Sequence, residues 1–150
     1  TMIYGAEGED NVQRLAALMR RLPVLPLPGG GRALVQPIHQ DDVTACLLAA
    51  IRIAHDAPRV LDIAGPAPLP YREFCAAIAR AAGIRPRPVL PVPAALLMAL
   101  APLARLAGTH LGRDEVRRLT EDKAFDITAM RRDLGVTPRP LAEGLRLTFA

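Results

Sequence analysis

The feature that most limits the fold is an alternation of short β-rich segments with amphipathic helical segments. Residues 1–5 (TMIYG) are rich in side chains that favour strands and end at Gly5, so they predict a strand that runs into a loop. A helix is expected next, because from Leu15 onward apolar residues recur at positions i, i+3, i+4 and i+7. Such alternation favours an α/β fold with some parallel pairing. A length of 150 residues suits one domain, residues 1–150, with a substantial core.

The rest of the chain continues this alternation. Residues 23–33 carry three prolines and three glycines, which predicts a flexible loop or an edge segment. Pro37 lacks an N–H, so the strand expected around it should lie at a sheet edge or be interrupted there. Strands are expected at residues 34–38 and 59–65, and helices at residues 43–54, 70–83, 112–123, 126–135 and 140–150.

The stretch IHQDD, residues 38–42, raises the question of a metal or acid–base site. A carboxylate at Asp41 or Asp42 would instead accept N–H groups from the first turn of the next helix and meet the positive end of its dipole. A metal would need further ligands, and the other two histidines have no ligand-like spacing. The sequence therefore predicts helix capping, with Asp42 favoured, and no metal site. His39 could bond within the fold or face a pocket, and the structural role is favoured.

The stretch PGGGR, residues 28–32, has the glycines of a phosphate-binding loop. In such loops the glycines lead from a strand into a helix, so that backbone N–H groups converge on the phosphate. Here they lead toward a strand, which predicts a flexible hairpin or lid, although Arg32 could still reach an anionic ligand. Nucleophilic catalysis has no candidate, because the chain contains no serine and Cys75 has no nearby histidine in the sequence. No catalytic residue is assigned.

Charge and apolar patterning limit the partners. The formal charge is +4, but the 18 arginines are scattered among acids without a basic stripe, which argues against nucleic-acid binding. Cys46 and Cys75 are too few for a disulfide framework and no signal peptide opens the chain, so a reducing, cytoplasmic location is expected. Residues 88–104 are uncharged and predict a buried helix interrupted by prolines. The alternative for this segment is contact with a membrane surface or a partner protein.

Five segments, taken in order, are similar to the C-terminal half of the extended and atypical short-chain dehydrogenase/reductases, the NAD-dependent epimerase/dehydratase family. They are TMIYG, the glycine-rich loop, IHQDD with the apolar helix after it, LDIAGPAPLPYREF, and DITAMRRDLGVTPRPLAEGL. IHQDD resembles the family's (I/V)-H-V-D-D before a helix. DITAMRRDLGVTPRPLAEGL resembles its C-terminal signature of a short helix, LG, a proline and a final helix. The resemblance covers essentially the whole chain.

This resemblance implies a two-lobed enzyme, in which an N-terminal Rossmann domain binds NAD or NADP and a smaller C-terminal lobe holds a small-molecule substrate. The family's glycine fingerprint and its catalytic Tyr-x-x-x-Lys precede the part matched here. Neither Tyr4 nor Tyr71 is followed by a lysine at the required position. We therefore expect a substrate-lobe fragment that begins inside a strand and carries the last pieces of the Rossmann sheet, while NAD or NADP is bound mainly by the missing N-terminal part.

The resemblance also implies site residues. The cofactor would be bordered by Met2, Ile3, Tyr4 and Gly5, and the substrate by Arg32, Gln36 and His39. Nucleotide-sugar members of the family often carry an arginine four residues before the motif histidine, where it holds the diphosphate. This chain has Val35 at that position, which weakens the case for a diphosphate substrate, although Arg32 could substitute.

Three functions stay open at this stage. The first is an NAD(P)-dependent epimerase, dehydratase or reductase, hence an isomerase or oxidoreductase, acting on a nucleotide sugar or a related carbonyl or alcohol; this part would supply the substrate cleft. The second is a non-catalytic dinucleotide-binding accessory or scaffold protein, similar to a subunit associated with respiratory complex I. Residues 88–104 and the missing diphosphate arginine favour the second. The third is a globular domain without a ligand. A homodimer is compatible with any of them.

Overall fold

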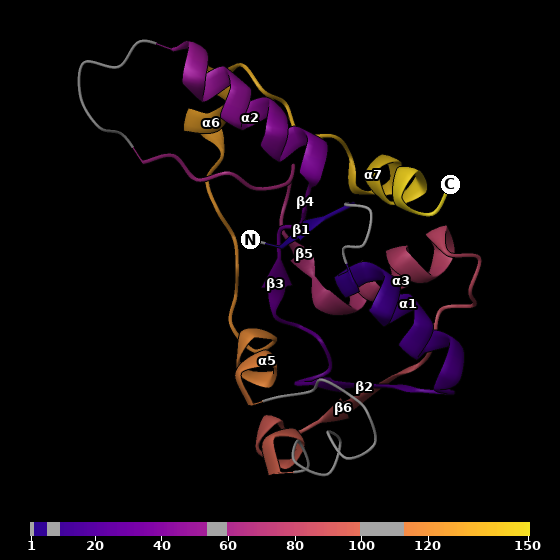
Figure 1. Cartoon of the computed structure of the whole chain (residues 1–150). Coiled ribbons are helices and arrows are strands. Elements are labelled where there is room, and N and C mark those ends of the chain that lie inside the picture. Colours follow the sequence, from indigo (N-terminus) through magenta and orange to yellow (C-terminus); the bar gives the residue numbers. More distant parts are fainter. Residues whose placement is uncertain (1, 6–9, 54–59, 100–112) are drawn as a thin grey trace.

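The computed structural model describes residues 2–5, 10–53, 60–99 and 113–150, and its architecture is mixed α/β, as expected (Figure 1). The strands are β1 (Ile3–Tyr4), β2 (Leu25–Pro28), β3 (Leu34–Val35), β4 (Ile38–His39), β5 (Leu69–Pro70) and β6 (Val89–Val92). The helices are α1 (Asp10–Arg21), α2 (Gln40–Arg52), α3 (Tyr71–Ala81), α5 (Arg113–Arg118), α6 (Thr128–Leu134) and α7 (Leu141–Thr148). Residues 94–99 are also helical.

The strands of the described ranges form three two-stranded ladders, two of them parallel. β1 runs parallel to β4, with Ile3 opposite Ile38 and Tyr4 opposite His39. β2 runs parallel to β6, and β3 runs antiparallel to β5. The expected parallel pairing is therefore present. Within the described part of the chain, β1 pairs along one edge alone.

Pro37 divides the strand expected at residues 34–38, and the prediction of an interruption there is confirmed. β3 ends at Val35, and β4 begins at Ile38. The two pieces pair with different partners, β5 and β1. Pro37 has no N–H to donate to a neighbouring strand, and Gln36 and Pro37 link the two sheets.

Two proline-rich segments pair with each other as β2 and β6. The first was expected as a loop or edge segment, and the second as a buried helix. The N–H groups of Leu25 and Gly29 reach the carbonyls of β6 and its flank at 2.9 and 3.1 Å. Pro26 and Pro28 alternate with these donors, so the missing N–H groups fall on the other edge of β2. The helix that follows β6 buries Leu97 but leaves Leu96 half exposed, so the expectation of a buried helix over residues 88–104 is wrong for the described residues 88–99, and residues 100–104 lie outside the described ranges.

The strand expected at residues 59–65 is absent from the described residues 60–65, which carry no strand assignment. This stretch is hydrogen-bonded to Gln36 at Gly65. The N–H of Gly65 lies 3.4 Å from the carbonyl oxygen of Gln36, and the side-chain amide of Gln36 donates to the carbonyl oxygen of Gly65 at 2.8 Å. Gly65 is therefore the residue through which this stretch is bonded to Gln36, and no ladder forms along the described residues 60–65.

The glycine-rich loop caps helix α3. The N–H groups of Tyr71 and Arg72 donate to the carbonyl oxygens of Ala33 and Gly31 at 2.9 and 3.0 Å. Gly31 has φ +65°, and a Cβ on it would lie 3.1 Å from the backbone nitrogen of Arg72. The loop therefore uses two of its carbonyls on the first turn of a helix, which accounts for Gly31 without a phosphate. The α3 helix ends as predicted, with Gly83 at φ +67° beyond its last turn.

Two hydrophobic clusters hold the elements together. The larger cluster joins α1, α3, α7 and β1 around the fully buried side chains of Tyr4, Phe74 and Leu145. The smaller one lies between α2 and α6 around Cys46 and Met130. Figure 1 shows α2 with α6 on one side of the central strands, and α1, α3 and α7 on another. Both described cysteines are buried and unbridged, as small core residues should be.

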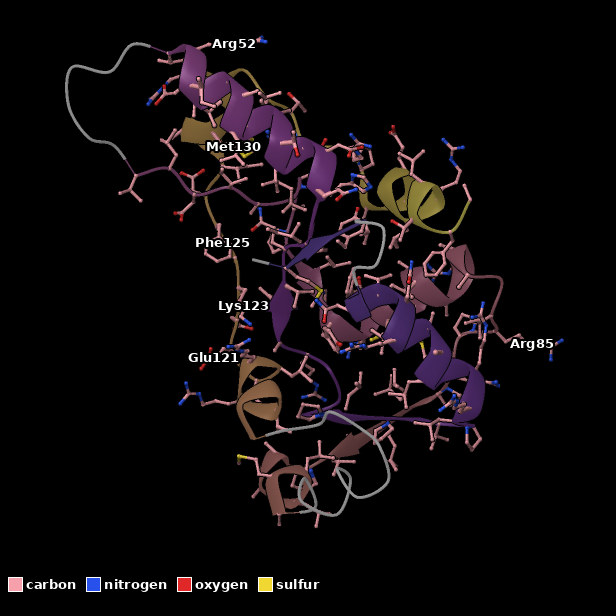
Figure 2. The ribbon with its side chains drawn as sticks, viewed as in Figure 1. Arg52, Arg85, Glu121, Lys123, Phe125 and Met130 are labelled. Atoms are coloured by element: carbon pink, nitrogen blue, oxygen red, sulfur yellow. The ribbon has the colours of Figure 1, made fainter. Side chains whose placement is uncertain are left out.

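The extended segment between α5 and α6 runs beside β3 (Figure 2). The N–H of Lys123 donates to the carbonyl oxygen of Leu34 at 2.8 Å, and the N–H of Leu34 donates to a carboxylate oxygen of Asp122 at 2.8 Å. Two residues further on, the N–H of Phe125 donates to the Oε1 of Gln36 at 2.7 Å. These bonds fix α5 and the segment after it against the central strands.

Candidate functional site

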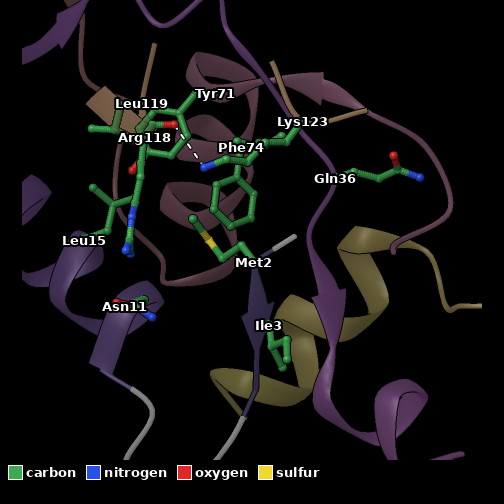
Figure 3. Close-up of a pocket in the computed structure, with 11 residues that line it drawn as sticks. Met2, Ile3, Asn11, Leu15, Gln36, Tyr71, Phe74, Arg118, Leu119 and Lys123 are labelled. Atoms are coloured by element: carbon green, nitrogen blue, oxygen red, sulfur yellow. Dashed lines mark hydrogen bonds between the residues drawn. The ribbon is translucent and has the colours of Figure 1, made fainter. Parts of the chain in front are cut away.

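A cavity of about 570 Å³ lies where β1, α1, α3 and α5 meet (Figure 3). Its lining residues come from separate parts of the chain and are Met2, Ile3, Asn11, Leu15, Val35, Gln36, Tyr71, Phe74, Arg118, Leu119 and Lys123. This volume suits a small organic molecule. The cavity is therefore the candidate functional site among the described residues.

Apolar side chains form most of the cavity wall. Phe74 and Val35 are buried in the core below the cavity, and Met2, Leu15 and Leu119 cover its sides while partly buried. Helical spacing explains the α3 contribution, because Phe74 and Tyr71 lie one turn apart on the same face, with their ring centroids 6.1 Å apart. The site can therefore hold the apolar body of a ligand.

Two cations lie together at the cavity. Arg118 ends α5 and is exposed, and Lys123 follows on the extended segment, half-buried. The Nζ of Lys123 donates to the carbonyl oxygen of Arg118 at 3.1 Å, which holds the ammonium beside the end of α5. Figure 3 shows the guanidinium of Arg118 directed toward Asn11 and Leu15, along the cavity. This end of the cavity can attract an anionic group.

Tyr71 uses its hydroxyl inside the protein. Its side chain and that of Cys75, one turn further along α3, are hydrogen-bonded, and both are buried. Burial raises the pKa of the Tyr71 hydroxyl, and the neighbouring thiol raises it further. Burial also raises the pKa of the Cys75 thiol to about 12, so this thiol stays protonated and unreactive near neutral pH.

Gln36, expected beside the substrate, reaches the cavity but bonds elsewhere. It is 1% exposed, and its amide group joins Gly65 on one side to Phe125 on the other, at 2.8 and 2.7 Å. Figure 3 shows this amide directed away from the other lining side chains. Gln36 thus offers its stem to the cavity, and its amide holds two segments of backbone together.

His39, also expected at the substrate, is the N-cap of α2. Its Nδ1 accepts a hydrogen bond from the N–H of Asp41 at 3.2 Å, and its ring packs edge-on against Tyr4 with centroids 5.4 Å apart. The Nε2 faces Gly5 so closely that a Cβ there would overlap the ring. His39 is 4% exposed and does not line the cavity. Its role here is structural, which is the role that the sequence favours.

Asp42 does not cap α2, and the prediction that it does is wrong. Its two carboxylate oxygens accept hydrogen bonds from the backbone N–H and the Nε of Arg139, each at 3.0 Å. The Nη1 of Arg139 also lies 3.2 Å from a carboxylate oxygen of Asp41. Because His39 supplies the cap, Asp42 can tie the segment before α7 to the start of α2.

The remaining residues predicted for the site lie in three places: at the cavity, in the core and on the exposed surface. Met2 and Ile3 line the cavity, whereas Tyr4 is buried against α7, where a Cβ on Gly144 would overlap its hydroxyl. Burial raises the pKa of Tyr4 to about 12. Arg32 is exposed and lies outside the cavity lining.

Sequence reasoning missed the part of the site that follows α5. Arg118 and Lys123 look in the sequence like members of a charged, solvated helix, and only the bonds between Leu34, Asp122 and Lys123 bring them to the cavity. Tyr71 and Phe74 were expected on a core face, and the cavity borders that core. The described residues contain no group of three or more metal-ligating side chains. Within the same ranges, no helix has the length and apolarity needed to cross a membrane.

Comparison with solved structures finds chains of similar fold. The chain is similar to MoeE5 in complex with UDP-glucose and NAD, with a TM-score of 0.65 and 19% identity over 99% of this chain and 43% of that one. It is also similar to UDP-glucose 4-epimerase with UDP-glucose from Thermotoga maritima, with a TM-score of 0.66 and 18% identity over 99% and 42% of the two chains. A third similar structure is the NADPH-dependent quinone oxidoreductase QOR2 with NADPH from Escherichia coli, with a TM-score of 0.64 and 17% identity over 97% and 52%.

These likenesses show a fold of the kind found in NAD(P)-dependent epimerases and reductases. The chain spans about half the length of the three solved chains described above. No protein-family model matches the sequence, and no curated protein matches it. The agreement therefore concerns three-dimensional structure and supports the α/β class that the sequence predicted.

Proposed function

We propose that the chain is the substrate-binding part of an NAD(P)-dependent epimerase, dehydratase or reductase that acts on a nucleotide sugar or a related carbonyl or alcohol. One observation carries this proposal: the cavity opens beside β1, a strand with one paired edge within the described ranges, in a fold shared with chains about twice as long. A further part of the sheet beside β1 would carry NAD or NADP.

The proposed division of work follows from the residues present. NAD or NADP would supply the hydride chemistry, and the protein would position the substrate against it. Met2 and Ile3 line the cavity at the β1 edge, so they would separate substrate from cofactor, with Tyr4 in the same strand and Gly5 directly after it. The whole protein would act in the cytoplasm on a small molecule.

Calorimetric titration of the chain with NAD⁺, NADP⁺ and UDP-glucose tests this proposal. Because the cofactor would bind mainly to a part outside this chain, both dinucleotides should bind with dissociation constants above about 1 mM, the affinity of a contact worth about 4 kcal/mol. Micromolar binding of either dinucleotide would show that the cofactor site lies within these 150 residues. That result would contradict the proposed division into two parts.

A second candidate function is the non-catalytic accessory or scaffold protein. Two exposed leucines favour it. Leu90 on β6 is 51% exposed, and Leu96 on the helix that follows β6 is 49% exposed. Exposed leucines of this kind suit contact with a protein partner, a membrane surface or a second copy of the chain. Flotation with liposomes and light scattering of Leu90→Ser/Leu96→Ser against the unaltered chain would test it. Unchanged behaviour in both assays would remove this candidate.

A further inference from the structure

We propose that the ligand of the cavity is a carbonyl or alcohol compound with an apolar body and one anionic end, bound by Arg118 and Lys123. This inference rests on the proposed function and narrows its substrate class. It favours such an amphiphile over a hydroxyl-rich nucleotide sugar.

The cavity wall matches an apolar body. Phe74, Val35 and Tyr71 are 0%, 4% and 8% exposed, and they form a fixed apolar floor. Met2 and Leu15 add partly buried apolar sides. Removing the apolar surface of a ligand from water here gives a favourable free energy of binding.

The polar groups of the floor are already used by the protein. The amide of Gln36 bonds to Gly65 and Phe125, and the hydroxyl of Tyr71 bonds to the thiol of Cys75. A sugar needs hydrogen-bond partners for each hydroxyl that it buries, since a buried polar group without a partner destabilises the complex. The floor thus disfavours a sugar ring and accepts a hydrocarbon or an aromatic ring.

The two cations define the anionic end. The guanidinium of Arg118 has a planar pair of donors that suits a carboxylate or a phosphate. The ammonium of Lys123 has three donors, one of which goes to the carbonyl oxygen of Arg118, so its charge is held beside the last residue of α5. Both lie on the same side of the cavity, after α5 (Figure 3).

The floor of the cavity lacks the charge that a diphosphate would use. Val35 is apolar and lines the cavity, and Arg32, which could have replaced a missing arginine there, is exposed outside the lining. Among the described lining residues, Arg118 and Lys123 are the positively charged ones. One anionic group at one end is therefore the charge pattern that the cavity fits.

Calorimetric titration of the 150-residue chain with decanoate, decanol and UDP-glucose tests the inference, with decanoate kept below its micelle concentration and decanol below its solubility limit. Decanoate should bind about tenfold more tightly than decanol, the difference expected from one charge-assisted hydrogen bond. Arg118→Gln should remove that preference. Arg117→Gln is the matched control, because Arg117 lies on the same helix, is 73% exposed and does not line the cavity.

Leu15→Phe supplies a second, independent test. The larger side chain fills the cavity from α1 and should weaken decanoate and decanol alike, while circular dichroism checks that the fold is kept. Decanoate binding that is unchanged in both Arg118→Gln and Leu15→Phe would overturn the inference. Binding of UDP-glucose without decanoate would overturn it and leave the proposed function standing, whereas no binding by any of the three compounds would count against both.

Discussion

Asp42 is the residue whose role differs most from its sequence signal. It lies in the first turn of a helix, where a carboxylate usually caps, yet its side chain holds Arg139, 97 positions along the chain. The histidine two residues before the acid pair takes the cap, a role that sequence rules assign to smaller polar residues. Local patterns could therefore place this corner but could not show its long-range partner.

Asp42→Ala should lower the free energy of unfolding by about 2–3 kcal/mol, because two hydrogen bonds to a partly buried arginine are lost. A lost cap alone would cost about 1 kcal/mol. Asp42→Asn keeps an acceptor for the N–H of Arg139 and should lose about half as much. Urea unfolding of both variants gives the measurement, and equal small losses near 1 kcal/mol would support the capping role instead.

The two tyrosines of the chain predict its stability at high pH. Burial raises the pKa of Tyr4 to about 12 and also raises the pKa of Tyr71 above its ordinary value. In the unfolded chain both hydroxyls ionise near pH 10. Because the folded pKa values are the higher ones, this contribution to stability is complete below about pH 10 and is lost as the pH rises from 10 toward 12.

Ultraviolet absorbance of tyrosinate, followed with pH in the folded and the urea-unfolded chain, measures this directly. The unfolded chain should titrate near pH 10, and the folded chain should titrate higher. Tyr4→Phe should make the fall of unfolding free energy with pH less steep. Ionisation of both tyrosines near pH 10 in the folded chain would mean that neither ring is buried as described.

At the scale of elements, the amphipathic helices were predictable and the short strands were not. The helix signal of α3 repeats over three turns, and Gly83 ends it. β2 and β6 exist because Pro26 and Pro28 direct their missing N–H groups away from the ladder, which depends on a partner more than sixty residues distant. Residues 60–65 have a strand-like composition but form no strand, and their bonds to Gln36 at Gly65 join residues 29 positions apart, which no local propensity encodes.

The cap that the glycine-rich loop provides for α3 gives a test at this scale. Gly31→Ala should destabilise the chain more than Gly29→Ala. Both positions have positive φ, so both substitutions carry a strain of roughly 1–2 kcal/mol. Only at Gly31 would the new Cβ also press on Leu27 and on the backbone of Arg72, whereas at Gly29 it meets nothing within 4 Å. Thermal unfolding compares the stability of the two variants. Equal losses of stability would show that the loop does not hold the start of α3.

For the whole molecule, the order of motifs carried more information than any single one. That order indicated part of an NAD(P)-dependent protein with an α/β fold, and similarity to solved structures at under 20% identity supports the fold. The cavity could not be predicted, because its residues come together only when α5 and its following segment dock on β3. Arg118 and Lys123 are brought to it by backbone bonds, and backbone bonds leave little trace in side-chain patterns.

Nuclear magnetic resonance of the methyl groups during titration with decanoate tests the central claim, that this cavity is the ligand site. Signals of Met2, Leu15, Val35 and Leu119 should shift together and saturate. The exposed leucines of α2, Leu47 and Leu48, should not move, although an amphiphile that merely adsorbs to apolar surface would reach them first. Saturable shifts on α2 with none at the cavity would show that the cavity is not the ligand site.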